Sequence, residues 1–371
     1  MAYGCITNTG RQFAARRSAG EPVVILPEGG TTKHGMTLVE LLVVLVIVMM
    51  LAAVTIPRLR PDLERSRVRE AARSVQLYLS SARNQAIATG RSCGVQIERL
   101  VNYSSVGIAT VVEAGCSTTL SQVESPLGYC GETLSSLVNV SVANSSAKTV
   151  TVNLSYVPAI NSGLIRAGDT IQLGLQGPLY TITAAGGSTA TLDVSQGLSV
   201  PWTANGPAVP FKIFRQPVKS SATALQLPSP SVIDLTYSGI DYPQNTATPV
   251  FWASPTNTSD SSPIQIMFAP DGSIDRVYVD GQVSFPTAPI CLLIGKRQNV
   301  QNIPPPLDPT NLNMTDFNSL WVAINPRTGL IITTDLAPTN STTSNPPTVP
   351  APTDVYTSRT YARQSDARGG N

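Results

Sequence analysis

The chain has 371 residues, of which 42% are hydrophobic and only 13% are charged, so it can bury a sizeable core and is not a disordered chain. With 25 Lys and Arg against 23 Asp and Glu, its net charge of +2 provides no strong field to attract nucleic acid or anionic lipid. Its one histidine, His34, is the only residue on which a histidine-based catalytic triad or zinc site could be built.

One long apolar run lies near the N-terminus. Between Met36 and Ile56 only two threonines and Glu40 are polar. A helix over this run would be about 31 Å long, which matches the thickness of a bilayer core. We therefore expect a single transmembrane helix over residues 36–57. A buried core helix and a cleaved secretory signal are the alternatives, but the run lacks the polar face of the first and the small-residue cleavage site of the second.

The junction before the run carries the most specific motif. Residues 33–45 read KHGMTLVELLVVL, with a Gly, one apolar residue and then a lone Glu inside the apolar run. This pattern resembles the class III signal of type IV prepilins and type II secretion pseudopilins. The resemblance implies cleavage between Gly35 and Met36 by a prepilin peptidase, followed by N-methylation of Met36. It also implies that Glu40 pairs with the amino terminus of a neighbouring subunit, and that Pro57 kinks the helix.

The energetic cost of burying a charge also predicts that Glu40 pairs with a cationic group. An unpaired carboxylate inside the hydrocarbon layer costs a few kcal/mol. A glutamate that reaches out to the membrane surface is the alternative interpretation.

Cleavage would remove residues 1–35 as a leader, and His34 with it. The leader is longer than most prepilin leaders and contains Pro22 and Pro27. The remaining chain has no histidine, no Gly-rich phosphate loop, no nucleophile elbow and no calcium-loop pattern. We therefore expect no enzymatic activity, no cofactor and no metal site.

A second, amphipathic helical segment follows over residues 58–92. Apolar side chains recur at spacings of three and four, and Gly90 is a natural stop. This stripe consists of Val68, Ala72, Val75, Leu79, Ala82 and Ala86. We expect one helix from Met36 to Thr89, about 80 Å long, with the arginines of its other face in solvent.

Residues at the end of this helix resemble one particular type of pseudopilin. Ala82, Arg83, Ala86 and Gly90 match the head-junction signature of the GspH/FimT type of pseudopilin. Two later turns are similar to turns of the same family, namely Phe268 to Ser273 and Asn325 to Ile331.

The remaining chain predicts an α+β fold in which the long N-terminal helix packs on an all-β, pilin-like head over residues 93–336. We expect residues 100–216 to contain an inserted β-module and the Pro/Ser/Thr-rich residues 337–371 to be a disordered tail. Besides the strand-like residues 94–97, strands are predicted over Val106 to Val112, Leu137 to Val142, Thr149 to Tyr156, Thr170 to Leu175, Tyr180 to Ala184, Thr189 to Val194, Phe211 to Phe214, Ile264 to Phe268, Arg276 to Val279 and Leu320 to Ile324.

Four cysteines remain outside the leader, which contains Cys5. An even number in an exported domain indicates disulfides, with Cys116–Cys130 and Cys93–Cys291 as the preferred pairing among three. Free buried thiols are the first alternative, and a four-cysteine zinc site is the second, although no C-x-x-C spacing supports it.

These features predict a structural assembly protein, a minor pseudopilin or pilin of the bacterial inner membrane with its head in the periplasm. The resemblance implies three partners: a prepilin peptidase/methyltransferase, other pseudopilins and the inner-membrane assembly platform. A DNA-binding minor pilin is one alternative, for which the tail offers Arg359, Tyr361, Arg363 and Arg368. A membrane-anchored carbohydrate-binding β-sandwich is a distant one.

Overall fold

The computed structural model describes residues 37–100, 115–142, 151–157, 163–186, 189–193, 208–241, 250–252, 262–279, 282–300, 311–337 and 352–367. The expected leader, the cleavage residues Gly35 and Met36, and the predicted strand over residues 106–112 lie outside these ranges. The chain divides into two compact units, Met1–Pro57 and Arg58–Asn371, and each is described by itself.

Helix α1 (Leu38–Thr89) has 52 residues and contributes to both units. It begins two residues after the start predicted from the sequence and ends where predicted. Gly90, with φ +65°, terminates it in the left-handed conformation that glycine adopts without steric cost. The helix continues through Pro57, and the kink expected there stays a prediction.

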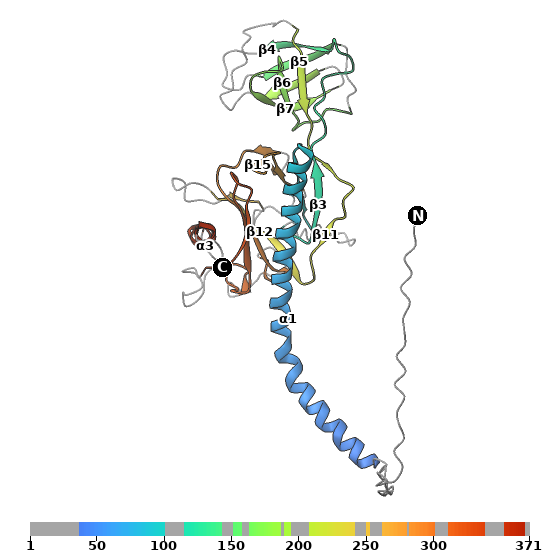
Figure 1. Cartoon of the computed structure of the whole chain (residues 1–371), viewed down its shortest axis with the longest axis vertical. Helices are drawn as coiled ribbons and strands as arrows, with labels where there is room; N and C mark the ends of the chain where they lie inside the picture. The colour runs from blue at the N-terminus through green and yellow to red at the C-terminus, as the bar shows by residue number, and fades with distance from the viewer. Residues whose placement is uncertain are drawn as a thin grey trace, which may run out of the picture. The chain divides into compact units, whose positions relative to one another are not determined.

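Two antiparallel sheets form the head (Figure 1). The first has the order β10-β3-β1-β14-β15-β16, with β11 also pairing with β3, and the second has the order β13-β12-β17-β18-β19, with β2 also pairing with β12. The bounds in the first sheet are β1 (Cys93–Glu98), β3 (Thr119–Glu124), β10 (Val218–Lys219), β11 (Leu225–Gln226), β14 (Ile264–Phe268), β15 (Ile274–Val279) and β16 (Gln282–Ser284). Those in the second are β2 (Cys116–Ser117), β12 (Ser231–Ile240), β13 (Val250–Phe251), β17 (Ile290–Lys296), β18 (Leu320–Ile324) and β19 (Ile331–Asp335), and the short helix η1 (Arg297–Asn299) follows β17.

The main core lies between α1 and these two sheets. All six residues of the predicted apolar stripe are fully buried in it. They pack with Val95 and Ile266 of the first sheet and with Leu235 and Leu292 of the second. Because one helical stripe fills the space between two sheet faces, the C-terminal half of α1 is part of the head.

A third sheet lies in the chain between β3 and β10. It comprises β4 (Leu137–Val142), β5 (Thr151–Val157), β6 (Thr170–Leu173), β7 (Leu179–Ala185), β8 (Thr189–Asp193) and β9 (Phe211–Phe214), in the order β4-β5-β8-β7-β6-β9. Val138 and Val209 exchange both backbone hydrogen bonds, so the sheet closes on itself. Its core is its own and is centred on Leu154, Ile182 and Phe211.

This module leaves and re-enters the head at two paired residues, Glu124 and Val218. Residues 100–216, which were expected to contain an inserted β-module, also include β2 and β3, and these two strands belong to the sheets of the head.

The expectation of a disordered tail is wrong for residues 352–367. They form helix α3 (Pro352–Ala367), which packs on β18 and β19. Val355 and Ala362 are buried there with Trp321. Trp321 Nε1 also donates a hydrogen bond of 2.9 Å to Ser358 Oγ, so both apolar and polar contacts hold the helix.

Candidate functional site

The first turn of α1 is organised by Thr37. Its hydroxyl Oγ1 accepts the backbone N–H of Glu40 at 3.2 Å, and its carbonyl accepts that of Leu41 at 3.1 Å. Thr37 and Glu40 have the spacing of a helix capping box, and a carboxylate in the first turn also stabilises the helix dipole. Glu40 is exposed and makes no ion pair within the part of the chain that the structure describes. The capping role of Thr37 was not predicted, although the T-x-x-E spacing is visible in the sequence.

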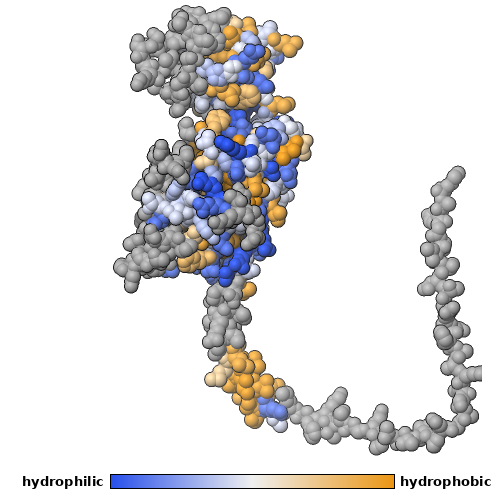
Figure 2. All heavy atoms as spheres, turned by 60° about the vertical axis from the view of Figure 1, so that its left-hand side comes forward, coloured by the Kyte–Doolittle hydropathy of each residue, from blue (hydrophilic) through white to orange (hydrophobic). Residues whose placement is uncertain are grey.

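The turns that follow present an apolar surface on every side. Each large apolar side chain from Leu38 to Leu51 is between 45 and 81% exposed. Figure 2 shows this stretch as a nearly continuous hydrophobic surface. A helix that is hydrophobic all round needs lipid or protein to cover it. No helix formed by the described residues is both long and apolar enough to cross a bilayer, and the span expected over residues 36–57 stays a prediction.

The predicted head-junction residues come together at the other end of α1. Ala82 and Ala86 are fully buried, so the helix approaches the sheets closely there. Arg83 Nε donates to the Gly272 carbonyl at 3.0 Å, and Arg83 Nη2 donates to the Thr328 carbonyl at 2.9 Å. One guanidinium therefore joins α1 to both turns that the sequence analysis selected.

The two turns also bind each other. Ile274 N–H donates to the Pro326 carbonyl at 2.8 Å. Gly329 adopts φ +61°, and a Cβ atom at this position would overlap the Gly272 carbonyl oxygen. The close approach of the turns therefore requires glycine at position 329.

Each turn is closed by a side chain of its own. The Asp271 carboxylate accepts the hydroxyl and the backbone N–H of Ser273 at 2.6 and 2.8 Å, and these hydrogen bonds hold the pKa of Asp271 below its usual value. Asn325 Oδ1 accepts the N–H of Arg327 at 3.0 Å. Asx turns of this kind are local, which explains why they could be read from the sequence.

Further polar contacts between α1 and the head were not predicted. Gln76 Nε2 donates to the Ile331 carbonyl at 3.0 Å, and Gln76 Oε1 accepts the Thr333 hydroxyl at 3.0 Å. Arg67, expected in solvent, donates to the Ser229 carbonyl at 2.9 Å. These partners lie more than 150 residues away in sequence, and no local pattern indicates them.

The predicted disulfides do not form. Cys93, Cys116, Cys130 and Cys291 are all free thiols. In one predicted pair, Cys93 belongs to the main core beneath α1, whereas Cys291 belongs to the core beneath α3. In the other pair, Cys116 is buried and Cys130 is exposed. Burial raises the pKa of the Cys291 thiol to about 12, which makes it unreactive near neutral pH.

The tail residues that the DNA-binding alternative would use differ in their exposure. Arg359 is fully buried, and its Nη2 donates to the Tyr237 carbonyl at 2.7 Å. Its guanidinium carbon lies 5.4 Å from the Phe251 ring centre and 5.7 Å from that of Trp321. Burial lowers the pKa of Arg359. Tyr361 is exposed, Arg363 is half-buried, and Arg368 lies outside the described residues.

Comparison with known families supports the N-terminal motif. Residues 31–56 match the family model of the prokaryotic N-terminal methylation motif. The motif indicates a precursor like those of type IV pilins and pseudopilins. It implies processing by a prepilin peptidase and assembly with other pilins. The matched residues include Gly35, Met36 and Glu40. No curated protein and no solved structure matches the chain.

Proposed function

We propose that this protein is a minor pseudopilin or minor pilin of the GspH/FimT type, a structural subunit of a periplasmic type II secretion pseudopilus or a type IV pilus. The methylation motif over residues 31–56 carries the proposal. Its support is the continuation of that motif into a helix whose second half is buried in a β-rich head. The head-junction residues Ala82, Arg83, Ala86 and Gly90 support the narrower type.

The proposed mechanism begins with cleavage after Gly35 and methylation of the new amino group of Met36. The exposed apolar surface of α1 lies in the inner membrane and, after assembly, among the α1 helices of neighbouring subunits. Glu40, which is exposed in the first turn, pairs with the positive amino terminus of a neighbour and sets the register of the subunits. Assembly then depends on burial and on one ion pair, with no catalytic residue and no cofactor.

The DNA-binding alternative has less support, because Arg359, one of the four tail residues it would use, is buried and hydrogen-bonded inside the protein. The head is accordingly proposed as a contributor to the tip or the surface of the filament.

The mass of the mature N-terminal peptide tests the processing step. Co-expressed with a prepilin peptidase, the chain should lose residues 1–35 and begin with N-methylated Met36. An intact leader, or a cut at another position, would contradict the proposal.

The Glu40→Ala variant tests assembly separately. It should be cleaved and membrane-inserted as efficiently as wild type, yet be absent from sheared filaments. Glu70→Ala, which removes an exposed glutamate from the same helix, is the matched control and should assemble normally. Normal assembly of Glu40→Ala would refute the pairing role.

A further inference from the structure

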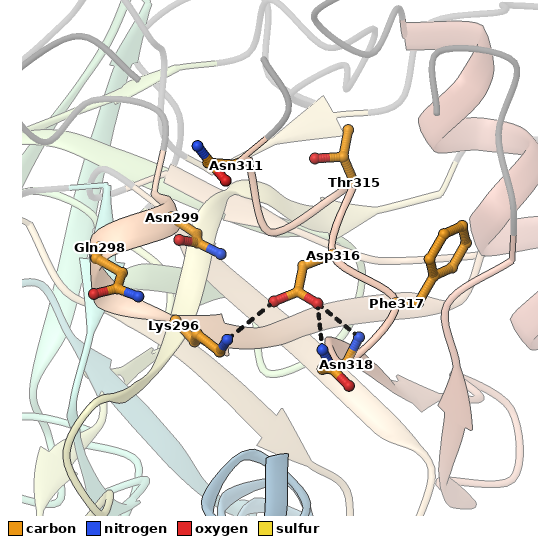
Figure 3. Close-up of a pocket in the computed structure, with 8 residues that line it drawn as sticks. All are labelled: Lys296, Gln298, Asn299, Asn311, Thr315, Asp316, Phe317 and Asn318. Carbon is orange, nitrogen blue, oxygen red and sulfur yellow. Dashed lines mark hydrogen bonds and ion pairs between the residues drawn. The ribbon is translucent and has the colours of Figure 1, made fainter. Parts of the chain in front are cut away.

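A cavity of about 380 Å³ opens on the head where β17 ends. Its walls come from η1 and from the segment before β18, and Figure 3 shows their side chains arranged around the opening. None of these residues belongs to the methylation motif or to the Arg83 junction.

One cation and two carboxylates form an ion-pair cluster at this cavity. Lys296 Nζ lies 3.1 Å from Glu64 Oε2 on α1 and 3.4 Å from Asp316 Oδ2. The second oxygen of Asp316 accepts the backbone N–H and the side-chain Nδ2 of Asn318, at 2.9 and 2.8 Å. Lys296, the only cation that lines the cavity, is therefore already paired with two carboxylates. An anionic ligand such as a phosphate would compete with them.

Besides Asn318, three carboxamide side chains line the same cavity, from Gln298, Asn299 and Asn311. None of these amides forms a side-chain hydrogen bond to another residue within the described ranges. Each offers two donors and one acceptor with two lone pairs. A ligand that satisfies them must itself carry groups that both donate and accept, as hydroxyls do.

An aromatic ring lines the same cavity, on the side opposite Gln298 and Asn299 in the view of Figure 3. Phe317 lines the cavity and is 57% exposed, which leaves much of its ring in contact with water. A flat apolar ring and several amides that line one cavity suit a ligand with one apolar face and hydroxyls at its edge.

We propose that this cavity binds a neutral saccharide, with the sugar hydroxyls hydrogen-bonded to Gln298, Asn299 and Asn311 and its C–H face on Phe317. The carboxylates of Glu64 and Asp316 outnumber the one lysine, which disfavours acidic sugars. This inference goes beyond the proposed function and does not depend on filament assembly.

Calorimetric titration of the full chain, held in micelles of a detergent without a sugar headgroup, tests the proposal. The probes are cellotetraose, chitotetraose and the acidic tetragalacturonate. At least one neutral probe should bind with Kd below about 10 mM, and more tightly than tetragalacturonate. Preference for chitotetraose would indicate an N-acetylated cell-wall strand as the source, and preference for cellotetraose would indicate a glucan.

Matched variants locate the binding. Phe317→Ala and Asn311→Ala should each weaken it by about tenfold, equivalent to about 1.4 kcal/mol. Phe285→Ala, which removes a ring that is 60% exposed outside the cavity, and Asn84→Ala, on the exposed face of α1, should leave it unchanged. The proposal is overturned if neither neutral probe binds, if the acidic probe binds more tightly, or if Phe317→Ala binds like Phe285→Ala.

Discussion

The two halves of α1 differ in what covers their apolar side chains, although they belong to one unbroken helix. Residues from Leu38 to Leu51 are apolar on every side and exposed, whereas the half from Val68 to Ala86 buries a single stripe beneath two sheets. The second half also donates hydrogen bonds to the head through Arg67, Gln76 and Arg83. The second half is therefore stabilised by contacts within the chain, whereas the apolar surface of the first half needs lipid or another protein to cover it.

Gly329→Ala, in a turn that Arg83 joins to the second half of α1, is expected to cause the largest loss of stability. The new Cβ atom overlaps the Gly272 carbonyl oxygen at a left-handed backbone position, so unfolding free energy should fall by about 4 kcal/mol. Gly174→Ala is the control, because its φ of +71° is similar but open space surrounds it, and it should cost about 1 kcal/mol. Denaturant unfolding of both variants measures the difference, and equal losses would show that the two turns need no close approach.

Leu79→Ala tests the comparison directly. Leu79 is fully buried beneath the sheets, and its truncation should cost about 3 kcal/mol. Leu77→Ala removes the same atoms from a residue of the same helix that is 70% exposed, and should change stability by less than about 0.5 kcal/mol. Val44→Ala in the first half should also leave the unfolding of the head unchanged. A destabilised head in the Val44 variant would break the distinction between the two halves.

Asp234 should make the unfolding free energy of the head depend on pH. Burial raises the pKa of this carboxyl to about 6 from its ordinary 3.8, despite hydrogen bonds from Thr236 and Asn313 that lower it. Since the folded state holds the proton more tightly, the stabilisation is complete below about pH 4 and is lost as pH rises through 6, by about 2 to 3 kcal/mol. Unfolding measured from pH 4 to 7 should follow this slope in wild type. Asp234→Asn should flatten it, and an unchanged slope in that variant would exclude Asp234 as its source.

Arg83→Met is expected to have the smallest effect. The variant keeps the aliphatic part of the side chain but loses hydrogen bonds to the Gly272 and Thr328 carbonyls, so stability should fall by about 1 to 2 kcal/mol. Arg73→Met, at an exposed position of the same helix, is the control. If thermal unfolding shows equal small losses for both, the guanidinium adds no net stability at the junction.

Much of the fold could be predicted because its signals are local. The apolar stripe and Gly90 predicted the second half of α1, and the alternation of apolar and polar residues predicted strands such as β4 and β14. Strands β12 and β17 were missed because they are buried on both faces, so they lack the alternation that indicates a half-exposed strand.

The unpredicted parts depend on contacts that are distant in sequence. Helix α3 has a polar composition typical of disorder, yet it is held by Trp321 and by the carbonyl of Tyr237, 37 and 122 residues from their partners in the helix. The Arg83 junction was predicted as a set of residues, but its hydrogen bonds span 189 and 245 positions. The cavity near Lys296 likewise combines residues from β17, η1 and the segment before β18.

The pairing of Glu124 with Val218 has a practical consequence. Paired residues of neighbouring strands lie only about 5 Å apart, so the head presents two chain ends that are already joined by its own sheet. Another domain with close termini could replace the module at this point without lengthening any strand of the head. The protein thus offers an attachment point for displaying foreign sequences along whatever filament it enters.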